Sequence, residues 1–276
     1  MILVAGGTGR LGTDLVGRLV AGGEQVRVLT RDAGRAAHLP PVELVVGDVR
    51  DPGDVARAVA GADAVVSAVH GFTGRGVSPS SVDRDGNACL VDAAAGVGAH
   101  VVLVSGLGAA PDHPVELFRM KAAAEQHLRA SGAPWTIVRA GAFLELYRDL
   151  FRRTAGRAGR PLVLGRGDNP VTFAAVPDVA AAVVQALTDP ACRDVVLEVP
   201  GTTMTFRELA ATMEPELGAG ARSPRHVPRP VLRLLALAAA TAPGRLAAAA
   251  LVMDTSERTA EVGDAALEGS RVHQQE

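Results

Sequence analysis

The first twelve residues contain the feature that most constrains the fold, because an apolar run breaks there into glycines at three-residue spacing. The run ends at Ala5, and glycines stand at positions 6, 9 and 12 before an amphipathic pattern begins. This order predicts a strand, a tight turn and a helix. Gly6 would permit the sharp reversal, Gly9 would let a pyrophosphate approach the backbone, and Gly12 would let the helix lie close to the strand. The N–H groups at the helix start would then face the anion. The other residues of the turn expected to contact it are Thr8, Arg10 and Leu11.

Apolar runs and helical patterns alternate through the chain after this turn. The expected strands are residues 25–30, 42–47, 62–69, 100–105, 135–139 and 195–199, and the expected helices are 52–60, 82–95, one opened by Pro114, and 178–187. Between them, residues 72–81 are rich in glycine and serine, which indicates a flexible loop. Alternating units of this kind imply right-handed crossovers and a parallel sheet whose strand ends gather at one edge. The predicted fold class is α/β, with a doubly wound parallel Rossmann sheet.

The composition excludes several classes of protein. The 276 residues carry a formal net charge of −2 and are 48% apolar, so the chain can bury a full core and has no basic excess for nucleic acid. No signal peptide precedes the glycine turn, and the apolar region 231–253 is broken by Arg233, Pro243 and Arg245, which predicts two helices and no membrane span. Two unpaired thiols, Cys89 and Cys192, fit a reducing compartment, so a cytoplasmic location is expected.

The ends of the next strands predict how a dinucleotide would be recognised. Arg31 follows the second strand, where an acid would accept from the 2′-hydroxyl of NAD, so NADP(H) is the expected cofactor. Arg35 and Arg10 could join it around a 2′-phosphate, although arginine is plentiful throughout the chain. Asp48, which precedes Val49 at the end of the third strand, could accept from the adenine amino group. His70 follows the fourth strand and is either a catalytic acid or a polar surface residue.

These residues together resemble the NmrA-like branch of the atypical short-chain dehydrogenase/reductases. The motifs that carry the resemblance are Gly-Gly-Thr-Gly-Arg-Leu-Gly, Val-Leu-Thr-Arg, Gly-Asp-Val, Asp-Arg-Asp-Gly-Asn with Asp-Ala-Ala, Leu-Val-Ser-Gly, Phe-Arg-Met-Lys-Ala-Ala-Ala-Glu and Trp-Thr-Ile-Val-Arg. The resemblance covers residues 1 to about 200. It implies an NADP-binding core over residues 1–152 and a smaller, mainly helical substrate lobe over 153–276, with about 174–200 returning to the core sheet. The positions that would approach the cofactor are Arg31, Asp48, Val49, Ala68, Val69, His70, Lys121, Ala140, Gly141 and Phe143.

Two departures from the family pattern concern the chemistry. Leu117 stands where a Tyr-x-x-x-Lys motif has its tyrosine, and leucine cannot exchange a proton; Ala140 replaces a common proline. Of the 28 basic residues only Lys121 is a lysine, which indicates a role that arginine cannot fill, either ribose binding or proton transfer. Ser105 stands at the strand edge where the reaction would occur. Tyr147, the only tyrosine, could supply the missing proton donor or could be a packing residue.

The sequence therefore predicts an oxidoreductase, an NADPH-dependent reductase of a small, fairly apolar carbonyl, quinone or enone compound. Two alternatives stay open: a regulatory protein that senses NADP(H) without turnover, and an isomerase or cyclase on the same fold. The expected partner is a small-molecule substrate, a homodimer is an open alternative, and no metal site is predicted.

Overall fold

The computed structural model describes residues 1–72, 76–156, 159–217, 223–238 and 241–255. They form two compact units, the first made of Met1–Ala140 with Val176–Val199 and the second of Gly141–Ala175 with the residues from Pro200 onward. The chain leaves the first unit after Ala140, ahead of the boundary at residue 152 that the sequence analysis placed after the next helix, because Ala142 and Phe143 pair within the second unit.

The first unit is built on a seven-stranded parallel sheet. Its strands are β1 (Ile2–Ala5), β2 (Val26–Thr30), β3 (Glu43–Val46), β4 (Ala64–Ser67), β5 (His100–Gly106), β6 (Trp135–Ala140) and β10 (Val195–Glu198). They lie in the order β3-β2-β1-β4-β5-β6-β10, and Ile2 of β1 pairs with both Val26 and Ala64. The chain order thus reverses between β1 and β4, as in doubly wound folds. The predicted fold class is confirmed.

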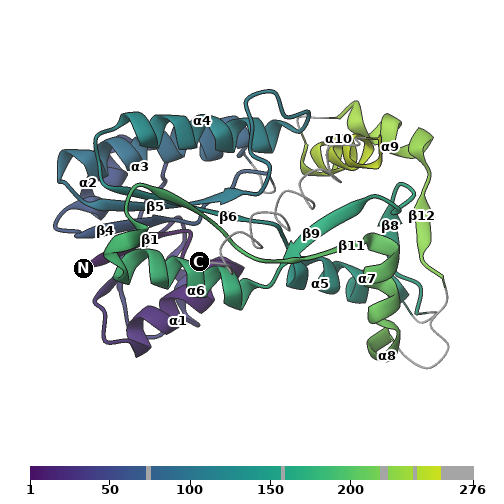
Figure 1. Ribbon diagram of the computed structural model, residues 1–276, viewed down its shortest axis with the longest axis horizontal. Helices are drawn as coiled ribbons and strands as arrows, with labels where there is room; N and C mark the ends of the chain where they lie inside the picture. The colour runs from purple at the N-terminus through teal and green to yellow at the C-terminus, as the bar shows by residue number, and fades with distance from the viewer. Residues whose placement is uncertain (73–75, 157–158, 218–222, 239–240, 256–276) are drawn as a thin grey trace, which may run out of the picture. The chain divides into compact units, whose positions relative to one another are not determined.

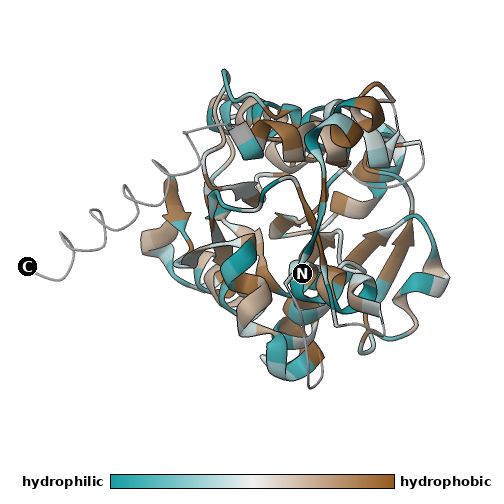
Figure 2. Ribbon diagram, turned by 90° about the vertical axis from the view of Figure 1, so that its right-hand side faces the viewer, coloured by the Kyte–Doolittle hydropathy of each residue, from teal (hydrophilic) through white to brown (hydrophobic). Residues whose placement is uncertain are grey.

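Helices cover both faces of this sheet. They are α1 (Arg10–Ala21), α2 (Pro52–Val59), α3 (Asp85–Gly96), α4 (Glu116–Ala130) and α6 (Val176–Thr188). Figure 1 shows α2, α3 and α4 on one face and α1 and α6 on the other. The strands are mostly hydrophobic, as Figure 2 shows, because the central strands β1, β4 and β5 are buried along their whole length. On the first face, Leu3 of β1 is buried in one core with Leu90 of α3 and Leu128 of α4.

Short helical turns fill three of the connections. They are η1 (Ala33–Ala36), the π-helix η2 (Pro79–Arg84) and η4 (Pro190–Cys192). The π-helix corrects the sequence interpretation of residues 72–81 as a flexible loop, because Ser78 and Ser81 form a reciprocal capping box that starts a helical turn at Pro79. Residues 73–75 of that segment lie outside the described residues.

The second unit contains two small sheets and several helices. One sheet has the order β11-β9-β7, with β7 (Ala142–Phe143), β9 (Pro170–Ala174) and β11 (Thr202–Thr205), and the other pairs β8 (Leu162–Leu164) with β12 (Arg225–Val227). The helices are α5 (Leu144–Ala155), α7 (Phe206–Thr212), α8 (Glu214–Leu217), α9 (Arg229–Ala236) and α10 (Ala242–Thr255). Its core includes Phe151, Phe173 and Met213.

Sequence predictions for this unit are confirmed in part. Thr205 and Glu208 form a capping box at the start of α7, and the apolar region 231–253 forms the two expected helices. The C-terminal part is mainly helical, as expected, but it also contains the strands β11 and β12. These strands are short and pair with distant segments, so a local pattern gives little indication of them. None of the helices in the described ranges is long and apolar enough to cross a membrane.

Candidate functional site

The glycine turn joins β1 to α1 and leaves no room for a Cβ atom at Gly6 or Gly12. Gly6 has a φ of +86°, and a Cβ added there would lie 2.6 Å from the Ala68 carbonyl oxygen. A Cβ on Gly12 would lie 2.2 Å from the Gly6 oxygen and 2.5 Å from the Gly7 Cα. The Gly9 N–H donates to Gly6 O at 3.0 Å and closes the turn. Glycine is therefore required at position 12 because the backbone of the turn lies against it, whereas the sequence predicted only that the helix packs close to the strand.

The start of α1 is arranged to accept an anion. Gly9 is its N-cap, without a side-chain hydrogen bond to the first turn, and that turn contains no acidic residue. Thr8 is half-buried and Leu11 is buried, while the Arg10 side chain is exposed. Since the first N–H groups of a helix have no partner inside the helix, they are available to a phosphate.

The turn lies at the point where the sheet reverses its order. Ala68 and Val69 follow β4, and the Ala68 N–H donates to Ala5 O at 2.9 Å, so the end of β4 lies against the end of β1. In doubly wound sheets, ligands bind in the crevice outside the carboxyl ends of the strands at this reversal. The geometry thus brings the predicted phosphate-binding residues and Ala68 to one place.

Exposed cations follow β2. Arg31 and Arg35 are both exposed, and neither forms a salt bridge with another described residue. Asp32, which the sequence analysis passed over, accepts from Gly34 N at 2.9 Å as the N-cap of η1. This acid therefore has a structural partner, and Arg31 is the first residue beyond β2 that can turn toward a ligand.

Asp48 is held by a neighbouring arginine. Arg50 Nε donates to one Asp48 oxygen at 3.0 Å and Nη2 to the other at 2.6 Å, and this guanidinium lowers the pKa of Asp48. Arg50 Nη1 also donates to Gly76 O at 2.8 Å. Both carboxylate oxygens are thus engaged, although an ionised carboxylate has further lone pairs for an adenine amino group. Val49 is half-buried beside Gly86.

Lys121 lies at the carboxyl end of β5 with a buried acid. Its Nζ donates to Val104 O at 3.2 Å and stands 3.4 Å from Asp83 Oδ1. The Lys121 side chain is 14% exposed and that of Asp83 is completely buried. Asp83 Oδ2 accepts from Gly71 N at 2.7 Å, so the acid joins α4 to the segment after β4.

Further polar groups surround this pair. The Asn87 amide donates to Asp83 O at 2.8 Å and accepts from Ser67 Oγ, at the end of β4. Ser105 is 4% exposed, and its hydroxyl has no hydrogen-bond partner in the described part of the chain. His70 is exposed, but the protein atoms around its imidazole desolvate the ring and lower its pKa; the Asp83 carboxylate opposes this shift and the Lys121 ammonium adds to it. The lowered pKa favours the neutral ring, in which one nitrogen donates and the other accepts a hydrogen bond.

Asp83 and Asn87 appeared in the sequence only as the ends of the motif Asp-Arg-Asp-Gly-Asn and were not predicted as site residues. A pattern in the sequence could have indicated both, because positions 83, 87, 90, 91 and 94 follow helical spacing and the last three are the buried residues Leu90, Val91 and Ala94. Because Asp83 and Asn87 share this apolar face, they are buried with it, and buried polar side chains need hydrogen-bond or charged partners.

The second unit contains the other predicted residues. A Cβ on Gly141 would lie 2.3 Å from Thr172 O, and Phe143 of β7 pairs with Ala174 of β9. The Tyr147 ring contacts Phe173 and Phe206, with centroids 5.5 and 5.0 Å apart. Burial raises the pKa of the Tyr147 hydroxyl, so it stays protonated at neutral pH. These contacts are those of a packing residue, and the raised pKa favours the phenol as a proton donor over the phenolate as a base.

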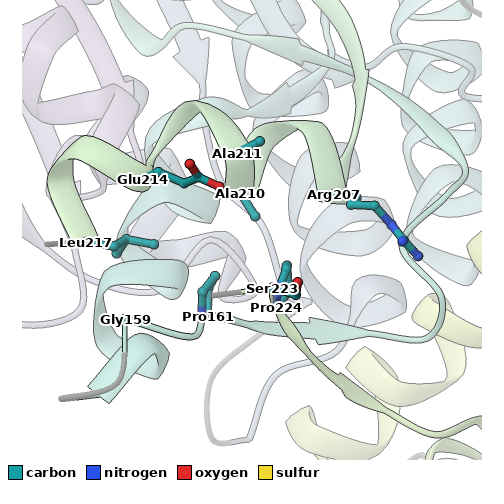
Figure 3. Close-up of a pocket in the computed structure, with 9 residues that line it drawn as sticks. All are labelled: Gly159, Pro161, Arg207, Ala210, Ala211, Glu214, Leu217, Ser223 and Pro224. Atoms are coloured by element: carbon teal, nitrogen blue, oxygen red, sulfur yellow. The ribbon is translucent and has the colours of Figure 1, made fainter. Parts of the chain in front are cut away.

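A pocket in the second unit lies apart from these residues. Figure 3 shows its lining from α7 and α8 on one side and from the segments before β8 and β12 on the other. Its charged residues are Arg207, which pairs with Asp168 at 2.9 Å, and Glu214. None of the predicted site residues lines it.

A family model described as NAD(P)H-binding matches residues 6–190, the range that holds the glycine turn, Arg31, Asp48 and Lys121. The chain belongs to this NAD(P)H-binding family. An NAD(P)H azoreductase of Xenophilus azovorans is 33% identical over 225 residues, which are 79% of this chain and 74% of the relative. A (4-alkanoyl-5-oxo-2,5-dihydrofuran-3-yl)methyl phosphate reductase of Streptomyces griseus is 34% identical over 221 residues, with the same shares covered.

Solved structures support the same fold. The triphenylmethane reductase of a Citrobacter species, solved with NADP(H), superimposes with a TM-score of 0.75 at 21% identity over 93% of this chain and 90% of its own. The NADPH-dependent quinone oxidoreductase of Escherichia coli, solved with NADPH, superimposes with a TM-score of 0.73 at 20% identity, over 92% of this chain and 89% of its own. The NmrA-like resemblance and the NAD(P)H cofactor class are confirmed, and the family includes NAD(P)H-dependent reductases.

The residues of the turn fit such a cofactor. The backbone packing beside Gly6 and Gly12 fixes the shape of the turn, and the exposed N-cap Gly9 has no side chain and no side-chain partner. Backbone N–H groups and the helix dipole then favour a pyrophosphate at this point. The glycine turn, Arg31 and Asp48 would hold its phosphates, its 2′-phosphate and its adenine, respectively.

Proposed function

We propose that this protein is an NADPH-dependent reductase of a small, fairly apolar compound with a carbonyl, quinone or enone group. The observation that carries the proposal is the position of Lys121, the sole lysine, beside a fully buried acid at the carboxyl end of β5. β5 is separated from the glycine turn only by β4. A cation at this edge faces the side of the sheet where the family binds its cofactor.

Each predicted residue has a role in this proposal. The bound nicotinamide supplies the hydride. Arg31, with Arg10 and Arg35, pairs with the 2′-phosphate through planar guanidinium groups. Ala68 and Val69, after β4, and Ala140, at the end of β6, would lie along the cofactor. Ser105, whose buried hydroxyl lacks a hydrogen bond within the described chain, donates to the substrate oxygen or to the carboxamide.

Proton supply is the second part of the chemistry. On the family resemblance Leu117 stands where a Tyr-x-x-x-Lys motif has its tyrosine, and the candidate donors in this proposal are Lys121 and Tyr147. The Lys121 ammonium has three N–H groups, one of which is directed to Val104 O. It can therefore hold the ribose hydroxyls, deliver a proton to the reduced substrate, or do both. Azo compounds belong in the substrate screen, because the azoreductase relative is named for them.

NADPH oxidation at saturating cofactor between pH 6 and 9 tests these roles with quinones, enones, aromatic ketones and azo compounds. Lys121→Arg keeps the positive charge but removes a side chain that can give up its proton. If Lys121 is the acid/base, this variant should lower turnover by about 10²-fold or more. Arg84→Lys, a charge-preserving change in an exposed salt bridge, is the matched control. Wild-type turnover in Lys121→Arg at every pH would eliminate proton transfer by this residue.

Tyr147→Phe is the companion variant, because a loss of the same size there would move the donor to the second unit. NADPH binding without turnover on any substrate would favour the sensing protein, which the leucine at position 117 supports. Product formation without net NADPH use would favour the isomerase or cyclase.

A further inference from the structure

The carboxylate of Asp83 is the most deeply buried charged group beside the proposed site, with no accessible surface. Its Oδ2 accepts from Gly71 N at 2.7 Å, whereas Oδ1 has no hydrogen bond from any described residue and lies 3.4 Å from Lys121 Nζ. A buried carboxylate is unfavourable unless a cation or several donors offset its desolvation. Lys121 is the cation that does so.

The backbone around Asp83 is held in an unusual turn. Residues Pro79–Arg84 form a π-helix in which the Asp85 N–H donates to Ser80 O, five residues back. A π-helical turn holds one residue more than an α-helical turn, which rotates Asp83 about the helix axis relative to a regular helix. Such turns occur often at functional sites. The amide of Asn87 donates to Asp83 O at 2.8 Å and fixes the position of the turn.

Gly71 shows how closely the neighbouring segment approaches. A Cβ on Gly71 would lie 2.1 Å from Ser78 O and 2.9 Å from Val82 Cβ, so only glycine brings its N–H to Asp83. From the π-helix, the Asp83 carboxylate therefore contacts two other parts of the chain, the segment after β4 through Gly71 and α4 through Lys121.

The other charges nearby are directed elsewhere. The groups that face Asp83 are Lys121 from α4 and His70 from the segment after β4. In the same turn, Arg84 pairs with Asp85 at 2.6 Å on the exposed side. Further along α4, Glu125 pairs with Arg139 at 2.7 Å.

We propose that Asp83 is a positioning residue for Lys121: its buried carboxylate holds the ammonium at the end of β5 and links it to the His70–Gly71 segment. One N–H group of Lys121 is directed to Val104 O, and the Asp83 carboxylate holds the ammonium as an ion pair at 3.4 Å, so N–H groups remain for a ribose hydroxyl or a substrate oxygen. Asp83 itself does not touch the ligand. The contact between Asp83 and Lys121 concerns the protein without a ligand. The effect of that contact on NADPH binding rests on the proposed function.

The single lysine allows a direct test on the free protein. Lysine labelled with ¹⁵N at Nζ gives one side-chain ammonium in the whole chain, and its protons exchange slowly with water only if hydrogen bonds hold them. We expect a resolved ¹H–¹⁵Nζ resonance in wild type and in Asp85→Asn, which removes an exposed acid two residues away. Asp83→Asn should lose the resonance to fast exchange. A wild-type-like resonance in Asp83→Asn overturns the proposal.

A double-mutant cycle on NADPH affinity tests whether Asp83 acts through Lys121. By calorimetry, Asp83→Asn should weaken NADPH about tenfold in the wild-type background and leave affinity unchanged in Lys121→Met. Equal losses in both backgrounds would show that Asp83 acts independently and would overturn the proposal.

Two outcomes separate this proposal from the proposed function. Wild-type NADPH affinity in Lys121→Met would remove the ribose role of Lys121, and the Nζ spectra would then decide the positioning role alone. If Asp83→Asn does not fold, the wild-type spectrum decides it: a slowly exchanging Nζ resonance supports the proposal, and a freely exchanging one overturns it.

Discussion

Two glycines of α1 provide an internal comparison for the phosphate-binding turn. Gly12→Ala adds a Cβ that would lie 2.2 Å from Gly6 O, more than 1 Å short of the 3.4 Å at which ordinary contact begins. The blocking atoms are backbone, so they cannot rotate away. Gly17→Ala, on the same helix, adds a Cβ with no atom within 4 Å. The same chemical change should therefore have opposite effects at the two positions.

The magnitudes follow from the contacts. An alanine at Gly17 should stabilise the protein by about 0.5–1 kcal/mol, because glycine is a poor helix former. At Gly12 the overlap should destabilise by about 1–3 kcal/mol, as inserting a methyl group into filled space does. The two variants should thus differ by about 1.5–4 kcal/mol in the free energy of unfolding, measured by urea denaturation. NADPH affinity should fall about tenfold or more in Gly12→Ala, equivalent to about 1.4 kcal/mol.

The affinity of Gly17→Ala for NADPH should match the wild type, since its Cβ touches nothing. A Gly12→Ala variant that is as stable as Gly17→Ala and binds NADPH equally well would refute the reasoning. That result would mean that the turn can move by 1 Å without cost, so its shape would not define the phosphate site.

Two further predictions concern the cofactor and the pH dependence of stability. NADPH should bind at least about tenfold more tightly than NADH, and Arg31→Ala should weaken NADPH while leaving NADH nearly unchanged in a calorimetric titration; equal affinities in the wild type would contradict the assignment. His100 is 2% exposed, and burial, with Arg193 nearby, lowers its pKa from 6.5 to about 4. The unfolded chain therefore binds the proton more readily, and stability should fall by about 2 kcal/mol as the pH drops from 7 to 5. His100→Gln, which cannot titrate, should show less of this loss in urea denaturation at the two pH values, and an identical loss would assign it to other groups.

The geometry of the glycine turn was largely predictable because its requirements are local. A positive φ at Gly6 and the absence of space beside Gly12 are properties of a few consecutive residues, so the spacing of the glycines carries them. Arg31 is similar, since the end of an apolar run predicts the end of a strand. The packing of Asp32 into the η1 cap needed the structure, because its side chain could equally have faced a ligand.

The acid beside Lys121 could not be predicted in the same way. The sequence indicated the importance of Lys121 through its uniqueness, but not its partner. Asp83 lies in a segment interpreted as the junction of a loop and a helix, and a π-helix changes the direction of its side chain. The contact with Lys121 exists because the parallel sheet places β4 beside β5 and brings α4 over the π-helix.

The sequence by itself determined the fold class, the phosphate-binding turn and the cofactor class, because backbone geometry and apolar periodicity are encoded over short stretches. The tertiary structure alone decided which polar groups meet at the end of β5: Asp83, Lys121 and Gly71 come from three separate segments. Their contacts depend on crossover connections and on burial, which lowers the dielectric and forces charged groups to pair. No short stretch of sequence contains that information.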